Sequence, residues 1–541
     1  MSEELLVAAQ AWLAEDPDEQ SRKEIQRFID ENNIAELHKR FFAPLTFGTA
    51  GLRGPVMSGA AGMNRLTVRR ATQAVAAWLA HEGIDPTKGV IVGRDARHGS
   101  AEFNEEVVAT LIGLGVRVIE MPSPAPTPFV PYLVRRLEAA AGIMVTASHN
   151  PKQDNGYKLY DWTGTQIIPP HDKTVEAFMD AAGPVTLGDR SSSLYQEVSV
   201  ADLESYYSLL ASRFGVDSFE GPPITYTAFH GVGGQHMVRL FENAGYQASV
   251  VQEQFSPDPE FPSLPFPNPE ELGALNSAIA HADSVGSRLI LANDPDADRL
   301  GVAIRDEAQW RVLKGDEIGW LLGHRAIQES TEGVVATTIV SSTLLAKIAA
   351  KAGVECRITL TGFKWIGRAG GDEELLFGYE EALGYAVDAH VGDKDGMSAA
   401  LAIAQIDQHL AANGKNIAKL LDEIANEYGL HITDQLSIRF NGDDSQSQLQ
   451  EKMNQLRTSP PASVGGLPVG EVADLAEGFR GLSPTNGMWL GLGAAGRIVV
   501  RPSGTEPKLK VYIEIVGEVA RDAATETISA IKTDMSVYFG V

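Results

Sequence analysis

The sequence predicts an α/β protein of three or four domains with a separate α+β unit at its C-terminal end. The chain has 541 residues, and domains average roughly 150 residues, which indicates three or four of them. Short apolar runs alternate with helical patterns over residues 89–147 and 288–360. This alternation is typical of parallel strands joined by crossover helices. From residue 426 on, the apolar runs are longer and a single helical pattern ends the chain.

The elements follow from the spacing of apolar residues along the chain. Two helical segments come first, at residues 5–13 and 22–41, ahead of a glycine-rich stretch. The expected strands are 89–95, 116–121, 141–147, 288–294, 299–305, 333–340, 354–360, 431–440, 497–502 and 508–517, and the expected helices are 100–115, 127–140, 342–353, 397–414 and 519–536. We expect domain limits near 1–200, 201–310, 311–425 and 426–541.

Composition excludes several classes of function. The chain holds 45 Lys and Arg against 71 Asp and Glu, a net charge of −26, which disfavours non-specific binding of nucleic acid or of an anionic membrane. A bound anion therefore needs a local pocket. The single cysteine, Cys356, excludes an internal disulfide and a zinc site built from cysteines. The N-terminus lacks a basic leader and no apolar run reaches membrane-spanning length, so a cytoplasmic protein is expected.

The first candidate loop, Thr146-Ala-Ser-His-Asn-Pro151, directly follows a predicted strand. Ligands of open α/β sheets lie at the carboxyl ends of strands, so Ser148 is a candidate nucleophile or phosphoryl carrier. The alternative is that Ser148 merely caps a turn. Downstream, Lys158 is a candidate acid–base group or phosphate contact, or else a surface lysine.

The second candidate loop, Asn293-Asp-Pro-Asp-Ala-Asp-Arg299, lies between two predicted strands. Its three carboxylates repel one another unless a cation neutralises them, and hard oxygen ligands select Mg²⁺ or Ca²⁺. The alternative is a solvated turn. A metal site at Asp294, Asp296 and Asp298 is the favoured interpretation.

Two further loops carry polar clusters. Gly378-Tyr-Glu-Glu-Ala-Leu-Gly-Tyr385 holds paired glutamates that could accept hydrogen bonds from a polyol, or form a polar turn. Arg501-Pro-Ser-Gly-Thr-Glu-Pro-Lys508 crowds donors around a glycine, which favours an anion site over an ordinary turn. By contrast, Gly491-Leu-Gly-Ala-Ala-Gly496 fits a dinucleotide fingerprint but leads into a strand, so we reject a dinucleotide site there.

In this order, the four loops resemble those of the α-D-phosphohexomutase superfamily, which includes phosphoglucomutases and phosphomannomutases. TASHNP is similar to its phosphoserine loop, DPDADR to its metal loop, GYEEALGY to its sugar loop and RPSGTEP to its phosphate loop. FGTAGLRG and GRDARHGS resemble two further family elements. The strings DPDADR, ASHNPKQDNGYK and TGFKWIG are closest to the type-2 branch, which also contains phosphopentomutases. The resemblance implies four domains in a heart-like arrangement, three of them related α/β domains and the last a smaller α+β domain.

The resemblance also implies roles for individual residues. Ser148 would carry the phosphoryl group and, with the three aspartates, would hold one Mg²⁺. Arg53, Lys158 and His149 would assist at the serine. The implied substrate-binding residues are Arg299, Lys364, Glu380, Glu381, Lys394, Arg501, Ser503, Gly504 and Thr505.

The implied reaction interconverts hexose 1-phosphates and 6-phosphates of glucose or mannose through a sugar 1,6-bisphosphate, which also serves as activator. A phosphopentomutase acting on ribose or deoxyribose 1-phosphate is the alternative within the family. A metal-dependent sugar phosphatase and a catalytically silent scaffold are alternatives from other classes. The expected partners are small sugar phosphates, with neither nucleic acid nor membrane, for a monomer or a homodimer. The motifs leave open the sugar preference, the phosphorylation state of Ser148 and the role of the first 40 residues.

Overall fold

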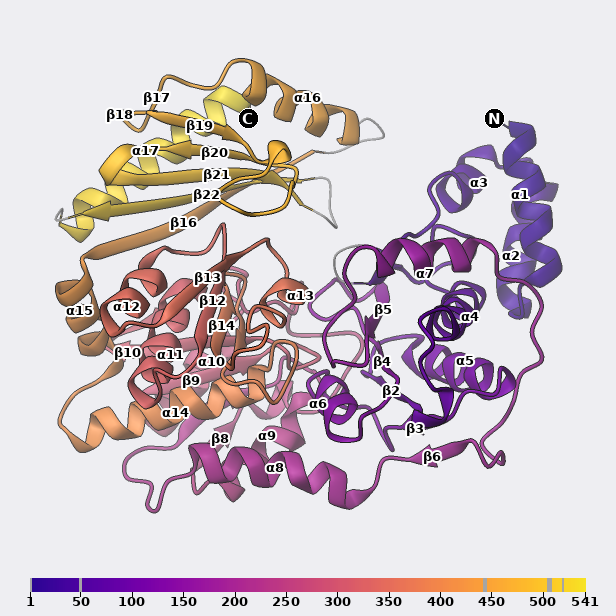
Figure 1. Ribbon diagram of the computed structural model, residues 1–541, viewed down its shortest axis with the longest axis horizontal. Helices are drawn as coiled ribbons and strands as arrows, with labels where there is room; N and C mark the ends of the chain where they lie inside the picture. Colours follow the sequence, from indigo (N-terminus) through magenta and orange to yellow (C-terminus); the bar gives the residue numbers. More distant parts are fainter. Residues whose placement is uncertain (1, 48–50, 441–444, 504–507, 518–519) are drawn as a thin grey trace. The chain divides into compact units, whose positions relative to one another are not determined.

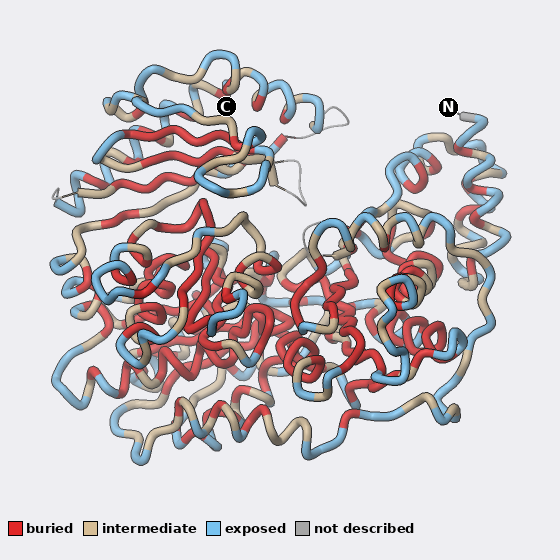
Figure 2. Tube along the Cα trace, in the orientation of Figure 1, coloured by how far each residue is buried: buried red, intermediate tan, exposed pale blue. Residues whose placement is uncertain are grey.

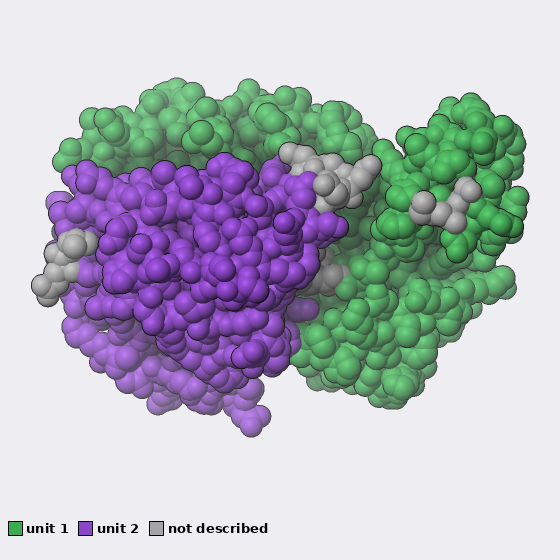
Figure 3. Space-filling model, turned by 90° about the horizontal axis from the view of Figure 1, so that it is seen from above, with its two compact units in different colours: residues 1–313, 382–412 green, residues 314–381, 413–541 purple. Residues whose placement is uncertain are grey.

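The computed structural model describes residues 2–47, 51–440, 445–503, 508–517 and 520–541 (Figure 1). It divides into two compact units (Figure 3). Unit 1 comprises residues 1–313 and 382–412, and unit 2 comprises residues 314–381 and 413–541.

A six-stranded mixed sheet forms the first half of unit 1. Its elements are β1 (Leu52–Pro55), α4 (Arg65–His81), η1 (Pro86–Lys88), β2 (Val90–Arg94), α5 (Ser100–Gly113), β3 (Val118–Glu120), α6 (Phe129–Arg136), β4 (Ala141–Val145), β5 (Asp154–Tyr160), α7 (His171–Asp180) and β6 (Tyr195–Glu197). The strand order is β1-β5-β4-β2-β3-β6. β2, β3, β4 and β6 are parallel, whereas β5 pairs antiparallel with both β4 and β1.

A five-stranded mixed sheet forms the second half of unit 1. Its elements are α8 (Val200–Phe214), β7 (Ile224–Thr227), α9 (Gly233–Asn243), β8 (Ala248–Val250), η2 (Gln252–Gln254), α10 (Asn276–Val285), β9 (Leu289–Asn293), β10 (Leu300–Asp306), β11 (Gln309–Val312) and α14 (Gly396–Ala412). The short strand β15 (Gly384–Ala386) precedes α14 and is not a strand of this sheet. The order is β11-β10-β9-β7-β8, with β7, β8 and β9 parallel and β10 antiparallel to its neighbours.

Three helices precede the first sheet: α1 (Ser2–Glu15), α2 (Glu19–Asp30) and α3 (Ile34–Phe41). Their buried side chains, among them Trp12, Phe28 and Leu37, form a small core that includes Leu66 of α4. The Arg40 guanidinium also donates to the Ser58 hydroxyl. The first 40 residues therefore pack on the first half of unit 1 as a helical extension.

Unit 2 contains a parallel α/β layer and an antiparallel C-terminal sheet. The first part consists of α11 (Gly315–Glu329), β12 (Val334–Thr338), α12 (Leu344–Ala352), β13 (Glu355–Thr359), α13 (Phe363–Ile366), β14 (Leu375–Glu380) and α15 (Ile417–Tyr428). The second consists of β16 (Leu430–Arg439), α16 (Ser445–Thr458), β17 (Ser463–Val464), β18 (Leu467–Pro468), β19 (Glu471–Asp474), η3 (Leu475–Glu477), β20 (Met488–Gly491), η4 (Gly493–Ala495), β21 (Gly496–Pro502), β22 (Lys508–Gly517) and α17 (Arg521–Phe539).

The C-terminal sheet has the order β16-β22-β21-β20-β19 and is antiparallel throughout. One face packs under α16 and α17, and Figure 2 shows its central strands as largely buried. The predicted fold class, α/β domains followed by a smaller α+β domain, is confirmed.

The expectation of parallel sheets holds for most strands of unit 1, but it fails toward one edge of each sheet, at β5 and at β10. β5 and β10 each return beside the strand they follow, because their connections are short loops rather than crossover helices. The short apolar runs in the sequence did not show whether a strand pairs parallel or antiparallel with the strand before it. Among the described helices, none combines the length and apolar character needed to cross a membrane.

A buried carboxylate ties the two parts of unit 2 together. Glu514 of β22 accepts hydrogen bonds from the Ser342 hydroxyl at 2.7 Å and from the Arg497 guanidinium at 2.9 Å, and it lies 2.9 Å from His431 Nδ1. Burial alone raises the pKa of Glu514, but Arg497 and His431 outweigh it and hold this pKa at about 2. The pair of Glu514 with its donors therefore stabilises the folded state only while the carboxyl is ionised.

We expect Glu514→Gln to lower the free energy of unfolding of unit 2 by about 3 kcal/mol at neutral pH. Because the folded pKa lies below the unfolded value of about 4.3, this contribution is complete above that value and is lost as the pH falls toward 2. Hydrogen exchange of β22 amides at pH 7 and pH 3 measures it, and the gap between variant and parent should roughly halve at pH 3. Glu526→Gln, on the exposed face of α17, is the control. An equal gap at both pH values would contradict the assignment.

Candidate active site

Ser148 lies in the loop that follows β4, with its side chain almost entirely buried. Its backbone has a φ of 54°, in the left-handed region that non-glycine residues rarely adopt. The hydroxyl donates to Asp294 Oδ2 at 2.7 Å and lies 3.1 Å from His149 Nδ1. Strain of this kind persists where surrounding contacts hold the backbone in place, and it is common at functional sites.

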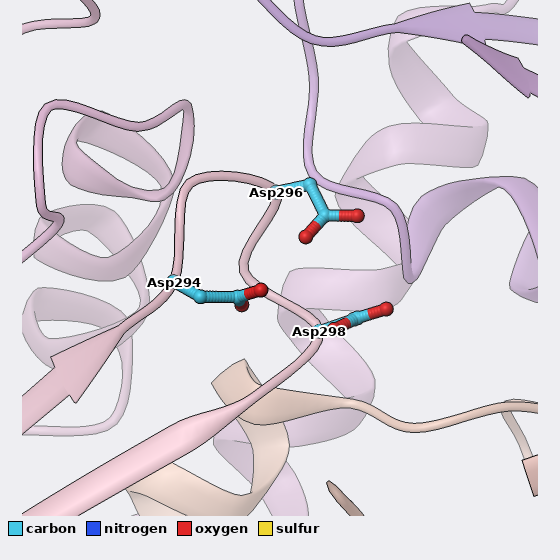
Figure 4. A group of neighbouring side chains, drawn as sticks. All are labelled: Asp294, Asp296 and Asp298. Atoms are coloured by element: carbon cyan, nitrogen blue, oxygen red, sulfur yellow. The ribbon is translucent and has the colours of Figure 1, made fainter. Parts of the chain in front are cut away.

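The three predicted aspartates project from the loop between β9 and β10 (Figure 4). Asp294, Asp296 and Asp298 are each 0% exposed, and one carboxylate oxygen from each lies within 4.8 Å of the others. Pro295 restricts the loop, and Ala297 has a φ of 57°. The alternation of acidic and small residues turns all three carboxylates toward one place.

Two lysines meet these carboxylates. Lys158 of β5 places its Nζ 2.7 Å from Asp296 Oδ2 and 2.6 Å from Asp298 Oδ2. Lys394 Nζ lies 3.3 Å from Asp298 Oδ2. Lys158 reaches the site because β5 runs antiparallel beside β4, which pairs Lys158 with Met144 near the carboxyl end of that strand.

The three aspartates of the cluster differ in the direction of their pKa shifts. Burial, reinforced by Asp296 and Asp298, raises the pKa of Asp294 well above its usual range. Burial also raises the pKa of Asp296 and Asp298, but Lys158 outweighs it and both pKa values are lowered. In return, the two carboxylates overcome the burial of Lys158 and raise its pKa, so its ammonium is charged at neutral pH.

His149 is neutral in this setting. Burial, together with the positive charges of Arg299 and Arg53, lowers the pKa of His149 well below its usual value. The residue therefore presents an uncharged imidazole beside the Ser148 hydroxyl.

The carboxylates fit a hard divalent cation. Asp296 Oδ1 and Asp298 Oδ1 are buried and accept no hydrogen bond from the described residues. Buried carboxylate oxygens without donors are costly, and Mg²⁺ prefers this kind of ligand. The donor set therefore suits the single Mg²⁺ expected from the sequence.

Two predicted arginines border the same loops. Arg53 of β1 donates from Nη1 to Asn150 Oδ1 at 2.9 Å. Arg299 donates its backbone N–H to Asp294 Oδ1 at 3.0 Å, and its guanidinium lies 3.7 Å from Glu270.

Sequence reasoning missed Thr127, whose hydroxyl donates to Asp296 Oδ2 at 2.6 Å. Its backbone N–H also donates to the Asp296 carbonyl. The residue lies in the proline-rich loop after β3, and its place beyond the end of a parallel strand was the one signal that could have identified it.

The other predicted residues belong to unit 2. Glu380 is buried at the end of β14, and Glu381 donates its N–H to Ser341 Oγ and accepts from that hydroxyl at 3.1 Å. Lys364 is buried on α13, with its ammonium 5.7 Å from the ring of Trp365.

The predicted phosphate loop is described only in part. Arg501 lies in β21, and Ser503 follows this strand and donates its N–H to the carbonyl of Lys508. Gly504 and Thr505 lie outside the described residues. The structure thus brings together nine predicted residues in unit 1 and places the other described ones in unit 2. The nine are Arg53, Ser148, His149, Lys158, Asp294, Asp296, Asp298, Arg299 and Lys394.

Four family models match the chain in sequence order. They are the phosphoglucomutase/phosphomannomutase α/β/α domain I at residues 44–185, domain II at 204–307, domain III at 314–428 and the C-terminal domain at 469–527.

Individual relatives cover most of the chain. A probable phosphomannomutase of Haemophilus influenzae is 39% identical over 85% of this chain and 95% of its own length. A phosphopentomutase of Homo sapiens is 34% identical over 96% of this chain and 94% of its own length. The fold is shared with a phosphoglucomutase/phosphomannomutase family protein of Burkholderia thailandensis, with a TM-score of 0.69, 19% identity and coverage of 91% of this chain and 97% of that one.

We expect Asp298→Asn to weaken Mg²⁺ binding about tenfold or more, because the change removes a charged ligand from the cluster. Titration calorimetry with Mg²⁺ measures the affinity, and a melting curve establishes that the variant is folded. Asp372→Asn, an exposed aspartate of unit 2, is the matched control. Unchanged affinity in the folded variant would remove Asp298 from the metal site.

Proposed function

The chain belongs to the phosphoglucomutase/phosphomannomutase family, and from that premise we propose that it is a phosphosugar mutase whose phosphoryl carrier is Ser148. Enzymes of this kind are intramolecular phosphotransferases. The observation that carries the proposal is the contact of the buried Ser148 hydroxyl with Asp294, inside a cluster of three carboxylates. A serine oxygen and a cation site this close suit transfer of a phosphoryl group.

The proposed step moves phosphate from Ser148 to a free hydroxyl of a sugar monophosphate. The bond between phosphorus and the serine oxygen breaks as a bond to the sugar oxygen forms. Charged Lys158 suits donation of a proton to the departing serine oxygen, and neutral His149 suits acceptance of one. When bound, Mg²⁺ supplies positive charge that stabilises the transferring phosphoryl oxygens. Arg53 adds positive charge beside the serine loop.

The remaining predicted residues would hold the sugar and its second phosphate. We assign Glu380, Glu381 and Lys364 to the sugar, because carboxylates accept well from neighbouring hydroxyls. Arg299 and Lys394 would contact the substrate from unit 1. For the phosphate that does not react, the donors would come from Arg501, Ser503, Gly504 and Thr505. A sugar 1,6-bisphosphate released between two transfers would also serve as activator.

The lead substrates are the glucose and mannose 1-phosphates and 6-phosphates. The Haemophilus influenzae relative, at 39% identity, is named a probable phosphomannomutase, which supports this choice. The second candidate is a pentose 1-phosphate, because the human relative that covers 96% of this chain is named a phosphopentomutase.

Ser148→Ala should abolish turnover and the transfer of ³²P from labelled glucose 1,6-bisphosphate to the protein, because the phosphoryl acceptor is lost. Labelling followed by peptide mapping locates the modified residue. Ser193→Ala, an exposed serine of the same unit, should keep both activities. Full activity in Ser148→Ala would overturn the phosphoserine mechanism.

We expect the highest kcat/KM on glucose 1-phosphate or mannose 1-phosphate in coupled assays. Equal or greater kcat/KM on ribose 1-phosphate would favour the pentose alternative. Steady release of inorganic phosphate, without any need for a bisphosphate activator, would instead identify a phosphatase.

A further inference from the structure

The structure points to a positioning device beside the serine loop, made of Asp95 and Arg97. Both lie in residues 95–99, between β2 and α5, and sequence analysis assigned them no role. We propose that Arg97, oriented by Asp95, holds the backbone around Ser148 in the conformation needed for phosphoryl transfer. This inference rests on the proposed function of Ser148.

Arg97 donates hydrogen bonds to backbone carbonyl groups of the serine loop. Its Nη2 donates to the carbonyls of Ser148 at 2.5 Å and Asn150 at 2.6 Å. Its Nη1 donates to the carbonyls of Pro151 at 2.9 Å and Asp154 at 3.3 Å. One buried guanidinium thus joins four carbonyls across the turn that carries the serine.

Asp95 orients Arg97 beside the serine loop. Its carboxylate accepts from the backbone N–H of Arg97 at 3.0 Å and lies 3.5 Å from Arg97 Nε. It also accepts a hydrogen bond from the Ser100 hydroxyl at 2.6 Å, and the Asp95 backbone N–H donates to the carbonyl of Val145 at the end of β4 at 3.0 Å. Within the serine loop itself, Thr146 Oγ1 accepts from the backbone N–H of Ser148 at 2.9 Å. The carbonyl of Ser148 is therefore bound by Arg97, which Asp95 orients, and the N–H of Ser148 is bound by Thr146.

These contacts have a physical reason in the backbone of Ser148. A left-handed φ at a non-glycine residue costs about 1 kcal/mol or more, so the loop needs external bonds to keep it. The bonds also direct the Ser148 and Asn150 carbonyl dipoles toward Arg97. Negative carbonyl oxygens are thereby kept with the guanidinium and away from the place where a phosphate would attach.

Only an arginine fits this position. A planar guanidinium offers five N–H donors in a fixed fork, whereas a lysine ammonium offers three donors on a flexible stem. Lysine keeps the charge but cannot span four carbonyls. The ring of Phe261, 5.0 Å from the guanidinium carbon, further holds Arg97 in place.

The test compares Arg97→Lys with Arg94→Lys. Arg94 precedes Asp95, and its side chain donates to the Asp95 carbonyl at 3.1 Å without bonding to the serine loop among the described residues, so its replacement is the matched control. We expect Arg97→Lys to lower kcat by about 10- to 100-fold, since small displacements of reacting groups have such effects. KM for glucose 1-phosphate should change by less than about twofold, because the proposed sugar-binding residues lie on other loops. Arg94→Lys should leave both constants near those of the parent.

A second measurement separates positioning from folding. Intact mass after incubation with glucose 1,6-bisphosphate reports the rate of serine phosphorylation, which should fall in Arg97→Lys in parallel with kcat. Low millimolar methylguanidinium should restore part of the kcat of Arg97→Ala, by returning the missing donors. An unchanged phosphorylation rate in Arg97→Lys, or no rescue of a folded Arg97→Ala, would overturn the positioning role. If Ser148→Ala itself stayed active, the proposed function would fail instead.

Discussion

Three carboxylates buried within a few ångströms of one another are the constraint around which unit 1 is organised. At an effective dielectric constant of about 20, two unit charges 4.8 Å apart repel by about 3 kcal/mol. The fold meets this cost with neighbours drawn from distant segments. Lys158 arrives on β5, Lys394 precedes α14, and Thr127 lies after β3. Lys158 and Thr127 join the first sheet to the aspartate loop of the second sheet, and Lys394 joins the segment before α14 to the same loop.

The geometry of the first sheet follows from this requirement. A purely parallel sheet would place a helix between β4 and the next strand, and Lys158 would lie far from the strand end where Ser148 sits. The antiparallel return of β5 instead sets Lys158 opposite Met144 and lets its ammonium reach the aspartates. The left-handed turn at Ser148 directs the hydroxyl to Asp294, while Arg97 binds the carbonyls of that turn. The strained serine and the buried acids are thus parts of one arrangement.

Local patterns predicted the loops well and the contacts between them poorly. The alternation in Asp-Pro-Asp-Ala-Asp is visible within five residues, and the serine after an apolar strand is equally local. Nothing in the spacing links Thr127 to Asp296, which is 169 positions away, or Ser342 to Glu514. Such contacts depend on which strands pair, and short apolar runs do not specify the direction of pairing. Arg97 lies within the string GRDARHGS, which sequence analysis singled out. Its hydrogen-bond partners are backbone carbonyls, however, and every residue type has one, so the sequence could not identify them.

The local balance of charge explains how an acidic chain can serve an anionic substrate. Near Ser148, carboxylates and cations alternate: Asp95 with Arg97, Asp298 with Lys158 and Lys394. The cluster is therefore far closer to neutrality than the chain as a whole, with its net charge of −26. A phosphate dianion on Ser148 would add negative charge beside the aspartates, and a bound divalent cation would offset it. In the proposed mechanism, Mg²⁺ and the phosphorylated serine would therefore stabilise each other, and the acidic composition of the chain would still disfavour polyanions.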